Sequence, residues 1–134
     1  MATRREAREW ALGLCYELEI RSGDAESVLA DLPAEPDPFG EYLVRGVSEH
    51  REAIDALIRK YSEHWTLERM PLVDLAILRI GTFELGWEQD LSAGVVISEA
   101  VELAKAYSTE NSSRFVNGLL ARIAEDVRVR DRAP

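Results

Sequence analysis

The sequence of 134 residues holds a single cysteine, Cys15, and only two histidines, His50 and His64. One cysteine excludes a disulfide within the chain and is typical of a reducing compartment, so we expect a cytoplasmic protein in which Cys15 is a small core residue. Neither histidine has a cysteine or a second histidine at the spacing of a zinc site. We therefore expect no metal and no cofactor.

Long apolar runs and glycine-rich loops are missing as well. No segment approaches the ~20 apolar residues of a membrane span, and the N-terminus lacks the apolar core of a secretory signal. Glycine-rich phosphate loops are absent, and the serines near position 110 have no neighbouring motif that would supply a base. Glu99 and Glu102 lie one turn apart, as solvated carboxylates on a helix often do. We expect that the chain is not an enzyme.

Positive charge is scarce, since 16 Lys and Arg face 25 Asp and Glu for a net charge of −9. This balance disfavours a protein that grips nucleic acid by bulk electrostatics, because phosphate binding draws on clustered cations. The first eight residues are an exception, with Arg4, Arg5 and Arg8 against the single acid Glu6. A local basic patch is therefore expected at the N-terminus.

Hydrophobic periodicity predicts an all-α protein with no strand-rich region. A chain of this length suits one compact domain. Thr3 and Glu6 form an S/T-x-x-E capping box, which predicts that the first helix begins at Arg4. The expected helices cover residues 4–20, 25–32, 39–65, 65–70, 71–87, 95–108 and 108–127. We assign residues 1–127 to one helical domain and expect residues 128–134 to be a frayed tail.

The stretch "STENSSRFVNGLLARI", residues 108–123, carries Asn117-Gly118 in its middle. Between apolar segments this dipeptide usually indicates a hairpin turn. The surrounding apolar residues instead follow the spacing of one helical face: Val116, Leu119, Leu120, Ile123 and Val127. Helix is therefore the prediction, and the glycine needs another explanation.

One edge of the first expected helix combines cations with an aromatic ring. Arg5, Arg8, Leu12 and Tyr16 fall within about 80° of a helical wheel on which each residue advances about 100°. Guanidinium groups on phosphates and a ring beneath a base are the means by which proteins hold single-stranded nucleic acid. The alternative is that Arg5 pairs with Glu9 and that Tyr16 is a core aromatic.

The last expected helix has a second edge of this kind. Asn111, Phe115, Gly118 and Arg122 lie within about 60° of each other, beside the apolar stripe. Phe115 could stack a base while Gly118 leaves room for the backbone. Equally, Phe115 could belong to the core and Gly118 could let a neighbouring helix pack closely, which sequence geometry alone favours. The functional hypothesis requires the two helix edges to meet side by side as a shallow track.

Three blocks of the sequence resemble the signature blocks of the bacterial NusB family of transcription antitermination factors. They match in order and spacing from about Arg4 to Ile123, and "EAVELAK" followed by "FVNG" is the most specific part. The blocks are "RREAREWALGLCYELE", "MPLVDLAILRIGTFEL" and "VVISEAVELAKAYSTENSSRFVNGLLARI".

The resemblance implies a seven-helix fold of two small bundles packed together and no enzymatic activity. Its implied partners are the ribosomal protein NusE, boxA-type single-stranded RNA in nascent ribosomal transcripts, and the RNA polymerase antitermination complex; a homodimer stays open. Glu68 and Asp74 resemble the region that receives NusE, although Glu68 could equally be a solvated charge. Combined with the helix edges, the expected RNA-binding residues are Arg4, Arg5, Arg8, Tyr16, Arg79, Asn111, Arg114, Phe115, Gly118 and Arg122.

The sequence departs from the family pattern at Glu6, where many relatives carry arginine, at Asn111, where aspartate is frequent, and at Ser98, where asparagine is usual. Two other functions stay open. One is a helical homodimer or scaffold with a masked RNA surface. The other is a NusB-like domain of a ribosomal RNA methyltransferase, which we do not expect because 134 residues leave no room for a cofactor-binding α/β domain.

Overall fold

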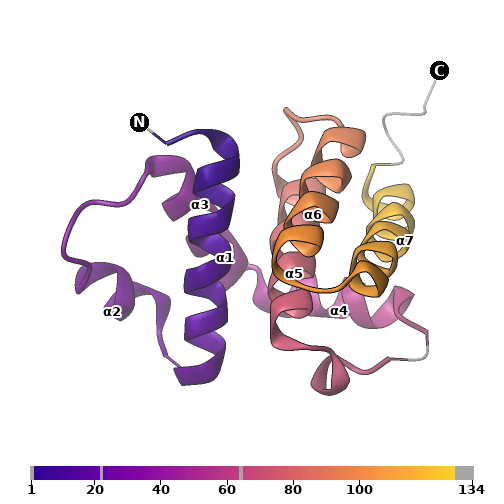
Figure 1. Ribbon diagram of the computed structural model, residues 1–134, viewed down its shortest axis with the longest axis horizontal. Coiled ribbons are helices and arrows are strands. Elements are labelled where there is room, and N and C mark those ends of the chain that lie inside the picture. The colour runs from indigo at the N-terminus through magenta and orange to yellow at the C-terminus, as the bar shows by residue number, and fades with distance from the viewer. Residues whose placement is uncertain (1, 22, 64, 129–134) are drawn as a thin grey trace.

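The computed structural model describes residues 2–21, 23–63 and 65–128 and consists of helices arranged as two bundles (Figure 1). No strand occurs in these described ranges. The elements are, in chain order, α1 (Arg4–Arg21), α2 (Ala25–Ala30), α3 (Pro38–Glu49), α4 (Arg51–Tyr61), the 3₁₀ helix η1 (Leu67–Arg69), α5 (Leu72–Trp87), α6 (Ala93–Tyr107) and α7 (Glu110–Val127). Helices α1–α3 form the first bundle and α4–α7 the second, which confirms the predicted fold class.

Helix α5 lies at the centre of the molecule, with apolar residues around its whole circumference and three charged residues that are paired or hydrogen-bonded inside the protein. All twelve residues from Asp74 to Leu85 are buried. The helix packs against α1 and α3 of the first bundle and against α4, α6 and α7 of the second. Each large apolar side chain that it buries contributes roughly 1.5–3 kcal/mol, so α5 joins the two bundles into one core. None of the described helices is both long and apolar enough to cross a membrane.

The single helix predicted over residues 39–65 is wrong, because the chain bends at His50 into α3 and α4. His50 has φ −108° and ψ 18°, and it ends one helix and precedes the next. Its ring stacks against those of Phe83 and Trp87, at centroid distances of 6.0 and 4.7 Å, and these two rings also stack on each other. The apolar residues on both sides of the bend keep one helical phase, so periodicity could not indicate it.

Several helix starts agree with the predictions from the sequence. The backbone N–H of Glu6 donates to Thr3 Oγ1 at 3.0 Å and that of Thr3 donates to Glu6 Oε1 at 2.9 Å, which confirms the capping box. Thr109 caps α7 through the N–H of Ser112. Helix α7 runs through Asn117-Gly118 without a break, so the helical interpretation of that stretch is confirmed.

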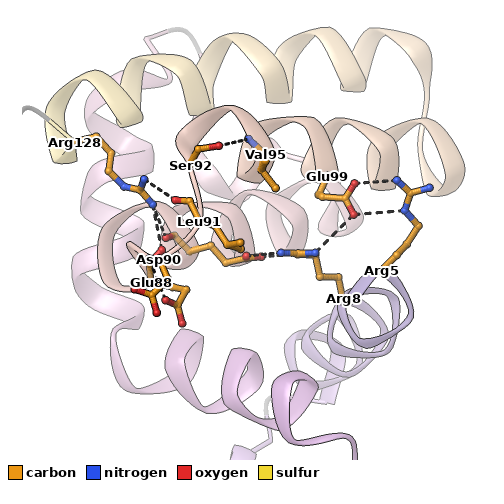
Figure 2. A network of polar contacts seen from close by, with 10 residues as sticks. Arg5, Arg8, Glu88, Asp90, Leu91, Ser92, Val95, Glu99 and Arg128 are labelled. Atoms are coloured by element: carbon orange, nitrogen blue, oxygen red, sulfur yellow. Dashed lines mark hydrogen bonds and ion pairs between the residues drawn. The ribbon is translucent and has the colours of Figure 1, made fainter. Parts of the chain in front are cut away.

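The frayed tail predicted from residue 128 is wrong for Arg128, which is buried. Its guanidinium donates to the carbonyl oxygens of Leu85 at 2.7 Å and of Glu84. It also donates to those of Leu91 at 2.8 Å and of Glu88 (Figure 2). The last carbonyls of a helix have few partners within it, so a cation beyond the end of α5 stabilises this helix end. The rest of the predicted tail, residues 129–134, lies outside the described residues.

Candidate nucleic-acid interface

The three N-terminal arginines differ in how far their guanidinium groups are already engaged. Arg8 is 4% exposed and donates to both carboxylate oxygens of Glu84, at 2.9 and 2.8 Å. A second carboxylate, that of Glu99, lies 3.6 Å from Arg8 Nη1. A buried charge needs such pairing, because leaving it unpaired is very costly. The expectation that Arg8 offers a free guanidinium to RNA is therefore wrong.

Arg5 and Arg4 are more accessible than Arg8. Arg5 pairs with Glu99 at 2.8 Å, but 59% of its side chain is exposed (Figure 2). It does not pair with Glu9, the partner that the sequence suggested as an alternative. The guanidinium of Arg4 lies 3.8 Å above the ring centroid of Phe39, and no acid among the described residues pairs with it. These two arginines keep N–H groups that a phosphate could accept from.

Arg79, expected from the resemblance to contact RNA, is also buried. Its Nε and Nη2 donate to Asp55 at 2.9 and 3.1 Å, and its Nη1 donates to Glu19 at 3.1 Å. The arginine thereby joins α1, α4 and α5, so the structure shows a packing role. Nearby Cys15 is half-buried, and burial raises the pKa of its thiol to about 12, which agrees with an unreactive residue.

The α7 edge is more open than the α1 edge. Phe115 is half-buried and lines a pocket of about 410 Å³, so its ring is neither sealed in the core nor freely exposed. An ideal Cβ on Gly118 would meet nothing within 4 Å, so no neighbouring helix packs against it. The other pocket residues are Trp65, Met70, Pro71, Asp74, Asn111 and Ser112. Arg114 is exposed, and Arg122 lies 3.6 Å from Glu63.

Asp74 forms part of the wall of this pocket and is bonded within the protein. Its carboxylate accepts hydrogen bonds from the hydroxyls of Ser108 at 2.6 Å and Ser112 at 2.7 Å. These bonds hold the turn between α6 and α7 against the first turn of α5. Asp74 is buried, whereas Glu68, the other acid expected to face a protein partner, is exposed on η1.

The two helix edges do not meet side by side, so the track as expected from the sequence is wrong. Helix α1 packs on α3 and α5, whereas α7 packs on α4, α5 and α6. Helices α5 and α6 lie between α1 and α7 (Figure 1). Tyr16 on α1 is exposed but belongs to the other bundle from Phe115. A ligand that touches both edges has to pass over α5 or α6.

Sequence reasoning missed the residues that surround and constrain the two edges. Trp65, Met70 and Pro71 build the pocket from the connection between α4 and α5, and the sequence indicated them only as a short helical turn and the start of a helix. Glu84 has no such signal, since it lies 76 residues from Arg8. Among the described residues, no group of three or more acidic, histidine or cysteine side chains is placed to hold a metal ion.

Comparison with known proteins agrees with this architecture. The model of the NusB family matches residues 5–125. The transcription antitermination protein NusB of Kineococcus radiotolerans is 50% identical over 130 residues, which are 93% of this chain and 95% of the relative. The structure of NusB from T. maritima superposes with a TM-score of 0.84 at 39% identity, covering 93% of this chain and 92% of that one.

A further similar structure contains partners. It is described as antitermination factors NusB and NusE in complex with double-stranded RNA, and it superposes with a TM-score of 0.76 at 29% identity. The match covers 92% of this chain and 96% of that chain. The matched family model spans both bundles and both helix edges. The chain belongs to the NusB family.

Proposed function

We propose that this chain is an RNA-binding transcription antitermination factor that binds boxA-type RNA together with NusE. The observation that carries the proposal is the likeness, over nearly the whole chain, to a relative described in complex with NusE and RNA. A relative of half-identical sequence that is named for antitermination supports the cellular role. Assembly with RNA polymerase and a cytoplasmic location are part of the proposal.

The structure favours a smaller set of RNA contacts than the sequence did. Arg4 and Arg5 supply the phosphate contacts of α1, because both keep accessible N–H groups. Arg8 acts indirectly: it lies beneath Arg5 and shares the carboxylate of Glu99 with it. Arg79 holds the fold and does not touch RNA.

The α7 pocket receives an unpaired base. Phe115 and Trp65 offer ring surfaces, and the exposed amide of Asn111 offers both a donor and an acceptor. A base reaches such a pocket only when it is splayed out of a helix, which is how proteins recognise RNA sequence. Arg114 and Arg122 lie on the same helix, α7; Arg114 is exposed, whereas Arg122 pairs with Glu63. The RNA is therefore single-stranded over this contact, unlike the double-stranded RNA named for the relative.

The strongly acidic composition explains why a partner would be needed. At a net charge of −9, the chain repels an RNA strand outside its few arginines. A basic protein docked beside the RNA would add its own contacts and reduce this repulsion. Exposed Glu68 on η1 is the acid that we assign to this partner, since Asp74 is bonded internally.

The test is a titration of single-stranded boxA-type RNA, with and without NusE, at several salt concentrations. Arg5→Ala should make the salt slope shallower by about 0.7, the value of one phosphate contact on a single strand. Phe115→Leu keeps apolar bulk but removes the ring, so it should weaken binding by roughly 1–3 kcal/mol. Arg21→Ala, at the exposed far end of α1, is the matched control and should change neither.

Two results would contradict the proposal in different ways. If the chain alone bound the RNA as tightly as the mixture with NusE does, the need for the partner would be refuted. If neither the chain nor the mixture preferred boxA-type RNA over a scrambled strand, the RNA function itself would be refuted. The same titration with a duplex decides whether the pocket needs an unpaired base.

A further inference from the structure

Helix α6 packs on α7 and contacts α1 through side chains, since Glu99 pairs with Arg5 and the last residue of α6, Tyr107, contacts Glu9. The Tyr107 side chain is 51% exposed, more than Tyr16 at 37% and Tyr42 at 41%. An exposed ring of this size is available to a ligand. It belongs to neither helix edge, and it is not among the residues of the hydrophobic core.

The contacts of Tyr107 connect it to both edges. Its hydroxyl donates to Glu9 Oε2 on α1 at 2.5 Å, and Glu9 lies one helical turn after Arg5. On its other side the next residue, Ser108, donates to Asp74, which lines the Phe115 pocket. Tyr107 therefore lies on the route from the accessible arginines of α1 to the aromatic pocket of α7.

We propose that Tyr107 is a base-stacking residue that carries the RNA strand across α6 between these two edges. The inference rests on the proposed function and adds a contact that neither helix edge supplies. The bond from its hydroxyl to Glu9 holds the ring at its tip. A ring that is already oriented loses less side-chain freedom when a base stacks on it.

The charges along this route favour bases over phosphates at Tyr107. Glu9, which accepts the hydrogen bond from the Tyr107 hydroxyl, is acidic and repels a phosphate that approaches the protein here. The cations stand at the two ends, with Arg5 on α1 and Arg114 on α7. An RNA strand whose phosphates contact these two arginines can turn its bases toward the protein between them. There the face of the Tyr107 ring can stack on any base.

The test uses the full chain with NusE and single-stranded boxA-type RNAs that carry the fluorescent base 2-aminopurine at one position at a time. Tyr107→Ala should weaken binding about 5- to 150-fold, the range of one base–aromatic stack, and should abolish the fluorescence quenching at one position. Tyr107→Phe keeps the ring and should bind within about twofold of the unchanged protein. Tyr107→Leu keeps apolar bulk without a ring and should behave like Tyr107→Ala.

The outcomes separate stacking from a structural role. If Tyr107 acted only by pinning α6 to α1 through its hydroxyl, Tyr107→Phe would lose as much affinity as Tyr107→Ala, and the inference would be overturned. The inference would also be overturned if Tyr107→Ala bound the RNA with normal affinity and quenched 2-aminopurine fluorescence at the same positions as the unchanged protein. Should the unchanged protein bind no RNA, the proposed function fails together with the inference, whereas normal binding by all three variants refutes the stacking role alone.

Discussion

The edges of α1 and α7 look alike in the sequence, where each combines arginine with an aromatic residue at helical spacing. In the structure they differ. Of the α1 arginines, Arg8 is fully engaged by the carboxylates of Glu84 on α5 and Glu99 on α6. Arg5 also pairs with Glu99 but stays largely exposed. The α7 edge instead opens beside a pocket. A stripe of cations on a helical wheel therefore overstates phosphate-binding capacity, because the acids that the fold brings from elsewhere decide which cations are free.

The largest expected effect is the difference in unfolding free energy between Arg8→Ala, which alters a buried arginine, and Arg5→Ala, which alters an exposed one. Arg8→Ala leaves the carboxylate of Glu84 without its bidentate partner, and Glu84 is only 2% exposed. Breaking a buried pair in this way costs about 3–5 kcal/mol of unfolding free energy. Arg5→Ala removes a solvent-exposed partner and should cost far less than Arg8→Ala, because exposed ion pairs contribute little to stability. Urea unfolding of the two variants measures both values.

Equal destabilisation by Arg8→Ala and Arg5→Ala would contradict this difference between the two arginines. The double variant Arg8→Leu/Glu84→Leu adds a control, because apolar residues of similar volume often replace a buried ion pair without loss of stability. It should therefore be more stable than Arg8→Ala. If the double variant is as unstable as the single one, the cost does not come from the orphaned carboxylate.

The features that the sequence predicted correctly are those that depend on residues close together in the chain. The capping box of Thr3 and Glu6 and the apolar face of α7 act within one or two helical turns, and both were predicted correctly. The bend at His50 was missed, because stacking on Phe83 and Trp87 stabilises it and those rings belong to α5. Local patterns contain no information about such distant partners.

The same limit explains the errors at the candidate site. Arg8 and Glu84 lie 76 residues apart, and Arg5 and Glu99 lie 94 apart. A helical wheel gives the face on which an arginine lies but not the acid that faces it. The resemblance to the family placed Arg79 correctly in a motif, yet only the structure shows it bonded to Asp55. For Phe115 the sequence left open a position at the edge or in the core and favoured the core, whereas the structure shows the residue half-buried at a pocket.

A smaller effect should come from the α7 edge at Gly118. Nothing lies within 4 Å of an ideal Cβ there, and the residue is exposed within a helix. Gly118→Ala should therefore raise the unfolding free energy by roughly 0.5–1 kcal/mol, as removal of an exposed helical glycine does. Thermal unfolding measures the change. Gly118→Leu separates stability from binding: an unchanged fold with weakened RNA binding supports a close approach of RNA, whereas unchanged binding contradicts it.

The smallest effect should be the pH dependence of the ion pair on the α1 edge. The hydrogen bond from Arg5, followed by the charges of Arg5 and Arg8, lowers the pKa of the Glu99 carboxyl below its usual 4.5. A lowered pKa in the folded state means that this stabilisation is present above pH 4.5 and is lost as pH falls through the lowered value. Because the pair is partly exposed, its contribution to stability should be small.

The variant Glu99→Gln tests this, with urea unfolding as the measurement. It should be less stable than the unchanged protein at about pH 6 and nearly equal to it at about pH 2. Glu102→Gln, whose carboxylate lies 3.8 Å from Lys105, is the matched control, and its stability difference should be smaller. If the difference in unfolding free energy between Glu99→Gln and the unchanged protein stayed constant with pH, Arg5 would not hold the Glu99 carboxylate in solution.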